Sequence, residues 1–148
     1  MRFTSILAAV LLTGSLYASE DARILEAIGA VETGNDPSKV GDRGKAYGQY
    51  QMRSAAWRDA NMQLLREGEQ TYPMSEWKRP MVQDIVGLAY LRVIRARLKS
   101  AGITKPTVTQ IALCWNLGFT AAYRLDFNHY LARGDYSARV TNIYASQN

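Results

Sequence analysis

Glu32 is the residue whose type and position point most directly to chemistry. It lies near the end of an amphipathic run over residues 21–34, on the same helical face as Ile28 and Leu25. It also falls in the last helical turn, just before Gly34, a residue type that often follows a helix C-terminus. The negative end of the helix dipole and an apolar neighbourhood both disfavour a carboxylate, so we expect a partly protonated carboxyl group that could act as a general acid. The alternative is an ordinary surface glutamate on a frayed helix end.

Side chains that could hold a polar substrate follow in two later segments. Gln51 lies near the end of a glycine-rich loop over residues 40–52, and Asn116 lies two residues before Gly118. Amide groups and aromatic ring faces are the protein groups that bind sugars. The aromatic candidates are Tyr47, Tyr50 and Trp115. The alternative is that the two amides satisfy caps or core groups and that the tyrosines only pack the loop.

Asp42 is the only acidic residue near these segments that could supply a second catalytic carboxylate. It precedes Gly48 by six residues in the same loop. It is also well placed to form a turn with Gly44, because Asp side chains hydrogen-bond their own backbone in turns. The sequence leaves both interpretations open.

Together these motifs resemble the lysozyme-like superfamily, most closely its lytic transglycosylase branch. That branch carries a Glu-Ser or Glu-Thr acid, a Gly-Leu-Met-Gln-type turn and an Ala-Tyr-Asn-Ala-Gly segment. The corresponding segments here are Glu32-Thr33, Gly48-Gln-Tyr-Gln51 and Cys114-Trp-Asn-Leu-Gly118. The stretch from Gly48 through Met52 to Trp57-Arg-Asp-Ala60 is also similar to the Gly-x-Phe-Gln-Ile…Tyr-Trp-x-Asp segment of invertebrate-type lysozymes. The resemblance spans about residues 21–145 and departs from the family at Trp115, where a tyrosine is usual.

The resemblance implies a role for each matching residue. Glu32 corresponds to the catalytic acid, and Gln51 and Asn116 correspond to amides that line the site beside it. The segment Thr141-Asn-Ile-Tyr144 is similar to the family's late Thr-x-x-Tyr element. We therefore expect Tyr144 to point back toward the acid. Asp42 corresponds roughly to the second acid of invertebrate-type lysozymes.

The implied function is cleavage of the glycan strand of peptidoglycan by an exported muramidase. As a lytic transglycosylase it would use one carboxylate, with the substrate's N-acetyl group assisting and its 6-hydroxyl closing an anhydro ring. One alternative is a hydrolytic lysozyme that uses Asp42, and another is an inactive wall-binding module of the same fold. A third is an exported helical protein unrelated to glycans, which predicts that Gln51 and Asn116 lie far from Glu32.

Motifs for other chemistries are missing from the sequence. It has no His-Glu-x-x-His motif or cysteine cluster for zinc, no phosphate loop and no Gly-x-Gly-x-x-Gly. We therefore expect neither a metal nor a nucleotide cofactor. Cys114, the only cysteine, lies in an apolar run and is interpreted as a core residue, and His129, the only histidine, as a surface residue.

The elements that must position these residues are nearly all helical. The apolar periodicity predicts helices over about 21–33, 54–66, 80–99, 107–117, 119–126 and 136–146. Residues 34–52 are too rich in glycine for a helix, and a short ribbon around 45–52 is the only strand signal. The predicted fold class is all-α, or α+β with a very small β-ribbon, in a single lysozyme-like domain over residues 19–148.

Composition and the N-terminus suggest where the chain acts. Of the 148 residues, 1–18 have the charged start, apolar centre and small-residue exit of a signal peptide. No second apolar stretch approaches membrane length. We expect a periplasmic or secreted bacterial monomer whose partner is peptidoglycan, with a secretion or conjugation apparatus as a further candidate partner. The net charge of +5 fits an anionic wall better than nucleic acid, and the basic run over residues 92–99 is either a solvated face or an attraction site for an anionic polymer.

Overall fold

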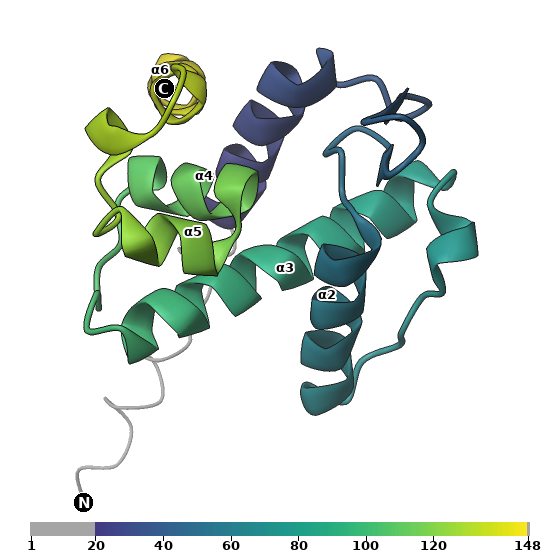
Figure 1. Ribbon diagram of the computed structural model, residues 1–148. Helices are drawn as coiled ribbons and strands as arrows, with labels where there is room; N and C mark the ends of the chain where they lie inside the picture. The colour runs from purple at the N-terminus through teal and green to yellow at the C-terminus, as the bar shows by residue number, and fades with distance from the viewer. Residues whose placement is uncertain (1–19, 148) are drawn as a thin grey trace, which may run out of the picture.

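Helix α3, Pro80–Ser100, is the central element of the fold. The computed structural model describes residues 20–147, so the predicted signal peptide lies outside the described residues. Figure 1 shows α3 running through the middle of the molecule, with α2 on one side and α4 and α5 on the other. Pro80 occupies the first turn of α3, where its missing N–H costs nothing. The buried face of α3 includes Val82, Val86, Leu91, Ile94 and Leu98.

The other elements are short and surround this helix. A helix over residues 20–33 opens the described chain. The remaining elements are β1 (Val40–Gly41), β2 (Ala46–Tyr47), α2 (Ser54–Arg66), η1 (Met74–Glu76), α4 (Val108–Leu117), α5 (Phe119–Arg124), η2 (His129–Leu131) and α6 (Tyr136–Ser146). The mostly helical fold class is confirmed.

The only sheet among the described residues is a ribbon of two-residue strands. Val40 pairs with Tyr47 and Gly41 with Ala46, antiparallel, and an isolated bridge joins Tyr47 to Met52. The predicted ribbon around residues 45–52 is therefore found, although its first strand begins earlier than expected. The ribbon folds the glycine-rich loop back toward the end of the first helix.

The helix over residues 20–33 lies close against α3. Its residues Ile24, Leu25 and Ile28 are almost fully buried. The close approach depends on Gly87 of α3, since a Cβ there would lie 3.0 Å from both methyl carbons of Leu25. The sequence pattern thus predicted the correct buried face for this helix, and that face fixes the position of Glu32 at its end.

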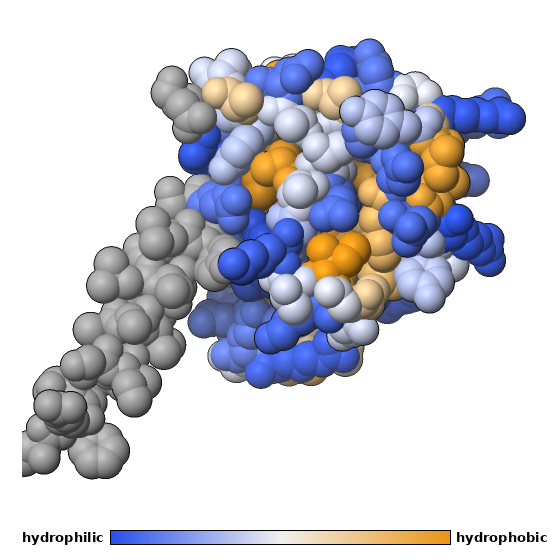
Figure 2. Space-filling model, turned by 90° about the vertical axis from the view of Figure 1, so that its left-hand side faces the viewer, coloured by the Kyte–Doolittle hydropathy of each residue, from blue (hydrophilic) through white to orange (hydrophobic). Residues whose placement is uncertain are grey.

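Helices α4, α5 and α6 form a second group. Helix α4 packs on both α5 and α6, and it begins with a capping box between Thr107 and Gln110. Figure 2 looks onto the α5 and α6 side of the molecule and shows apolar patches separated by hydrophilic side chains. The exposed large side chains of this region include Tyr123 of α5 and Tyr130 and Leu131 of η2. No helix within residues 20–147 has the length and apolar character needed to span a membrane.

Candidate active site

A cleft of about 560 Å³ opens where the first helix, the ribbon, α2 and α4 meet. Five of the predicted site residues line it: Glu32, Asp42, Gln51, Trp115 and Asn116. The other lining residues are Ala46, Met52, Arg53, Ala55, Ala56, Tyr90, Leu117 and Gly118. Residues from four separate segments thus share one cavity, as the sequence predicted. For a helical protein unrelated to glycans, the sequence predicted that Gln51 and Asn116 lie far from Glu32. That prediction is wrong, because all three residues line this cleft.

Glu32 has the environment of a proton donor. Its side chain is half-buried, and the hydroxyl of Tyr136 donates a 2.7 Å hydrogen bond to its Oε1. Burial raises the pKa of the Glu32 carboxyl above its ordinary value, and the hydrogen bond from Tyr136 lowers that pKa by a smaller amount. No cation pairs with this carboxyl among the ion pairs of the described residues. The group can therefore hold a proton and release it into the cleft.

The end of the first helix is anchored to the loop that follows it. Gly34 and Asn35 both have positive φ, and the N–H of Asn35 bonds back to the carbonyl of Gly29, which closes the helix end. The hydroxyl of Thr33 donates to the carbonyl of Gln49 at 2.9 Å. Glu32 thus lies on a helix turn that is fixed from two sides.

Gln83 of α3 holds the glycine-rich loop in place, although its side chain is only 2% exposed. Its Oε1 accepts from the N–H of Gln49 at 2.7 Å, and its Nε2 donates to the carbonyls of Trp77 and Pro37 at 2.7 and 2.9 Å. Gly48 has φ +74°, and a Cβ there would lie 2.4 Å from the Gln83 amide oxygen. The loop therefore needs both the buried amide and the glycine.

Gln51 has two roles in this arrangement. Its backbone is left-handed, with φ 48°, and its Nε2 donates to the carbonyl of Gly48 at 2.9 Å. A Cβ on Gly41 would lie only 2.0 Å from the Oε1 of Gln51, so the side chain needs a glycine at that position. The side chain therefore shapes the ribbon and also lines the cleft.

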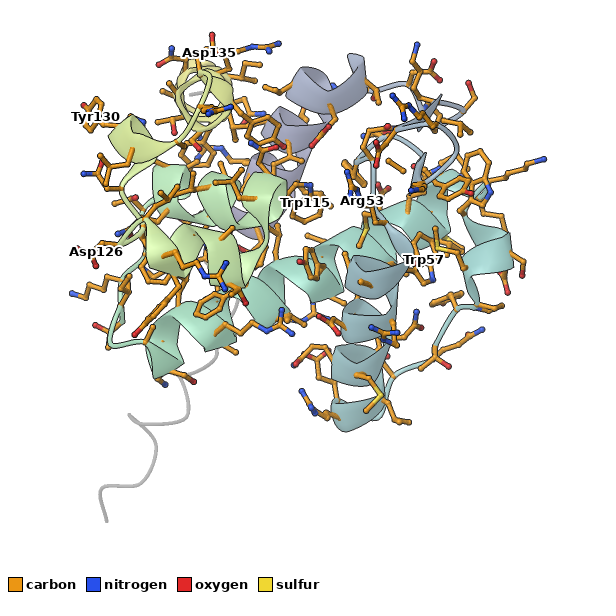
Figure 3. The ribbon with its side chains drawn as sticks, viewed as in Figure 1. Arg53, Trp57, Trp115, Asp126, Tyr130 and Asp135 are labelled. Carbon is orange, nitrogen blue, oxygen red and sulfur yellow. The ribbon has the colours of Figure 1, made fainter. Side chains whose placement is uncertain are left out.

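Trp115 and Asn116 form the α4 wall of the cleft. Figure 3 labels Trp115. The indole Nε1 of Trp115 donates to the carbonyl of Tyr50 at 3.3 Å, and its ring packs against that of Tyr90 in a T-shaped arrangement with centroids 5.2 Å apart. Asn116 is exposed to the cleft. Helix α4 ends one residue later, at Leu117, and is followed by Gly118 with φ 79°. Trp115 thus has a fixed orientation, whereas the amide of Asn116 is accessible.

Asp42 combines the two roles that the sequence left open. It lines the cleft, and it also lies in the turn between Gly41 and Gly44 with φ 48°. Its Oδ2 forms an exposed 2.6 Å ion pair with Nη2 of Arg53. Figure 3 shows Arg53 across the cleft from Trp115.

The three remaining predicted tyrosines lie outside this cleft. Tyr47 packs against Trp77, with ring centroids 5.2 Å apart, in an adjoining hollow. Tyr50 is buried, and its hydroxyl donates to Asp84 at 2.6 Å, so it supports the loop rather than a ligand. The ring of Tyr144 contacts the guanidinium of Arg23 at 4.4 Å.

The tyrosine that reaches the acid is Tyr136, and the expectation for Tyr144 is therefore wrong. Tyr136 lies eight residues earlier, at the start of α6. The sequence contains several tyrosines near its C-terminus, and the short Thr-x-x-Tyr match favoured Tyr144. The position of Tyr136 in the first turn of the last predicted helix was a usable signal, but the periodicity alone does not say which turn faces Glu32. Tyr90 and Arg53 were also missed.

The cysteine matches its prediction. Cys114 is fully buried, and burial raises the pKa of its thiol to about 12, which makes it inert at neutral pH. His129 is half-buried in η2 and stacks on Tyr130. Within residues 20–147, no group of three or more His, Cys, Asp or Glu side chains could hold a metal ion.

Comparison with known proteins found no match for this chain among protein-family models, curated proteins or solved structures.

Proposed function

We propose that the chain is an exported muramidase that cleaves the glycan strand of peptidoglycan, as a lytic transglycosylase with Glu32 as its acid and base. One observation carries the proposal. A carboxyl group with a raised pKa opens into a cleft of about 560 Å³ that also contains two amides and a tryptophan. The resemblance of the sequence motifs supports the same reaction.

The chemistry needs a proton first. Breaking the bond between the anomeric carbon and the bridging oxygen leaves an alkoxide unless that oxygen is protonated, and the neutral Glu32 carboxyl supplies the proton. The carbonyl oxygen of the sugar's own N-acetyl group then attacks the anomeric carbon. In the second half, the 6-hydroxyl of the same sugar displaces it and returns its proton to the Glu32 carboxylate.

The neighbours of Glu32 fit these two halves. Burial favours the neutral acid that begins the reaction, and the Tyr136 hydroxyl stabilises the carboxylate that forms in the middle of it. Because Tyr136 bonds to Oε1, the other oxygen can face the substrate. Asn116 and Gln51 are assigned to hydrogen bonds with the N-acetyl and hydroxyl groups of the sugar.

A hydrolytic lysozyme is the second candidate, favoured by one observation. Asp42 lines the same cleft as Glu32 and could activate water on the other face of the sugar. Its ion pair with Arg53 occupies one of its oxygens, which argues against a free base.

Product analysis separates these candidates. Purified peptidoglycan is incubated with the protein, and the soluble fragments are identified by mass spectrometry. We expect fragments with anhydro ends. Reducing ends would favour the Asp42-assisted hydrolase, and binding to the wall without soluble fragments would favour an inactive wall-binding module.

A further inference from the structure

A second hollow of about 530 Å³ adjoins the Glu32 cleft. The two share Arg53 and Ala55, so a chain lying in the first can extend into the second. The other lining residues of this hollow are Gly44, Lys45, Tyr47, Ser54, Met74, Ser75 and Trp77. We call it the η1 hollow, because η1 supplies one of its walls.

The η1 hollow has a fixed aromatic wall. The rings of Tyr47 and Trp77 lie 5.2 Å apart at 47°. Tyr47 is held by its ribbon pairing and by a hydrogen bond from its hydroxyl to the carbonyl of Gly44. The carbonyl of Trp77 accepts from the buried Gln83 amide. The framework that shapes the Glu32 cleft thus also positions this wall.

The charge of the η1 hollow is positive. Lys45 and Arg53 line it, and no Asp or Glu does. Because Arg53 is already paired with Asp42, the charge available to a ligand comes from Lys45. Lys45 takes part in none of the ion pairs found within residues 20–147. Lys78 lies over the Trp77 ring at 5.8 Å. The nearest acid on η1, Glu76, is paired with Arg79. The hollow therefore favours a ligand with apolar groups and a carboxylate.

We propose that the η1 hollow binds the carboxylate-bearing peptide substituent of the glycan strand whose sugar lies beside Glu32. The identity of this occupant rests on the proposed function, since wall glycan carries short acidic peptides. The rings of Tyr47 and Trp77 contact the aliphatic part of the peptide, and the ammonium of Lys45 pairs with a carboxylate. A bare sugar would use the rings but leave Lys45 without a role.

The experiment measures binding rather than cleavage, in a Glu32→Gln background that keeps the polymer intact. Two probes are compared: soluble peptidoglycan strands that carry their peptides, and the same strands after an amidase has removed them. The test variant adds Lys45→Gln. The matched control adds Lys39→Gln, an exposed lysine of the same loop that lines neither cavity.

We expect the parent protein to bind the peptide-bearing strands more tightly than the stripped strands. Lys45→Gln should weaken binding to the peptide-bearing strands by about two- to fivefold, as for an exposed charge pair. It should leave binding to stripped strands unchanged, and Lys39→Gln should change neither. Equal effects of Lys45→Gln on both probes, no effect on either, or no binding of either probe would overturn the inference.

The binding experiment tests the η1 hollow independently of whether the wild type cleaves peptidoglycan. If the wild type releases no fragments but the parent still prefers peptide-bearing strands through Lys45, the enzyme proposal fails and the η1 hollow stands. If the wild type cleaves both polymers and Lys45→Gln does not change binding, the enzyme proposal stands and the proposal for the η1 hollow fails.

Discussion

Two opposing effects set the proton affinity of Glu32. Removal of the carboxyl from water disfavours its charged form, and the hydroxyl of Tyr136 favours that form. Burial is the larger effect, so the pKa of Glu32 lies above its ordinary value. An acid of this kind is protonated over a wider pH range than a surface glutamate, and activity should fall as pH rises through its pKa.

Replacement of Tyr136 by Phe tests this balance. Loss of the hydrogen bond removes a contact that stabilises the carboxylate, so the pKa of Glu32 should rise further and the alkaline limb of kcat/KM should move to higher pH. The measurement is a pH–rate profile for wild type and Tyr136→Phe. Tyr144→Phe is the control, because Tyr144 lies outside the cleft. An unchanged alkaline limb in Tyr136→Phe would contradict the role given to this hydroxyl.

The Asp42→Asn variant distinguishes a reaction that uses Glu32 alone from one that also uses the Asp42 carboxylate. Asn tolerates the left-handed backbone found at this position and removes only the charge. For a transglycosylase we expect turnover within about threefold of wild type, since an acid–base group typically contributes about 10²- to 10⁴-fold. A loss of 100-fold or more, with the fold intact by circular dichroism, would instead support the hydrolase.

Much of the site could be predicted at the residue scale. Helical periodicity predicted that Glu32 lies on the buried face of its helix. The resemblance of the later motifs predicted that Gln51 and Asn116 lie beside Glu32. Tyr136 could not be predicted, because its contact with Glu32 depends on how α6 lies across α4. Sequence periodicity gives the buried face of each helix but not the crossing of two helices.

The side chain of Gln83 links several elements of the fold. One buried amide joins α3 to Pro37 before the ribbon, to Gln49 after the ribbon, and to Trp77, the residue after η1. The three hydrogen bonds of this one side chain fix the positions of segments that line both cavities. The loop has little regular structure of its own, so its shape depends on this contact.

Gln83→Ala should destabilise the protein by about 1–3 kcal/mol, because it leaves a partly buried N–H and two partly buried carbonyls without their partner. It should also lower turnover, since the loop that carries Gln51 loses its anchor. Urea denaturation and the rate of peptidoglycan release measure the two effects. The matched control is Gln63→Ala on α2, whose amide bonds only to Glu67 at the surface. Equal stability of the two variants would show that Gln83 is not an anchor.

Helix boundaries were largely predictable, whereas the loop anchor was not. Residues 54–66 and the start at Pro80 match α2 and α3. The helix predicted over 119–126 ends earlier, at Arg124, because Asp126 and Phe127 adopt positive φ. Gln83 is polar and lies near the start of α3, so no pattern distinguishes it from a solvent-facing glutamine.

The whole molecule is held together mainly by the apolar core around α3. No disulfide can contribute, since the chain has one cysteine and that residue is a free, buried thiol. The basic run on α3 is largely paired: Arg92 with Glu67, Arg95 with Asp21, and Arg97 with Asp59. These pairs favour a structural role for the run over attraction of an anionic polymer.

Leu91→Ala should lower the free energy of unfolding by about 2–5 kcal/mol, as for other fully buried leucines. Leu65→Ala is the control, because Leu65 is 62% exposed and should change stability by about 0.5 kcal/mol or less. Urea denaturation of both variants gives the comparison. A cost at Leu91 no larger than that at Leu65 would contradict the assignment of the core.

We propose that the Glu32 carboxyl donates the proton needed to break the glycosidic bond. The direct measurement is the rate at which wild type and Glu32→Gln release soluble fragments from purified peptidoglycan, with the fold of each checked by urea denaturation. Gln can still accept the hydrogen bond from Tyr136 through its amide oxygen, but it has no acidic proton to transfer. We predict that Glu32→Gln folds normally and loses at least about 100-fold in rate. A folded Glu32→Gln variant that releases fragments at the wild-type rate would contradict the role of Glu32 as the acid.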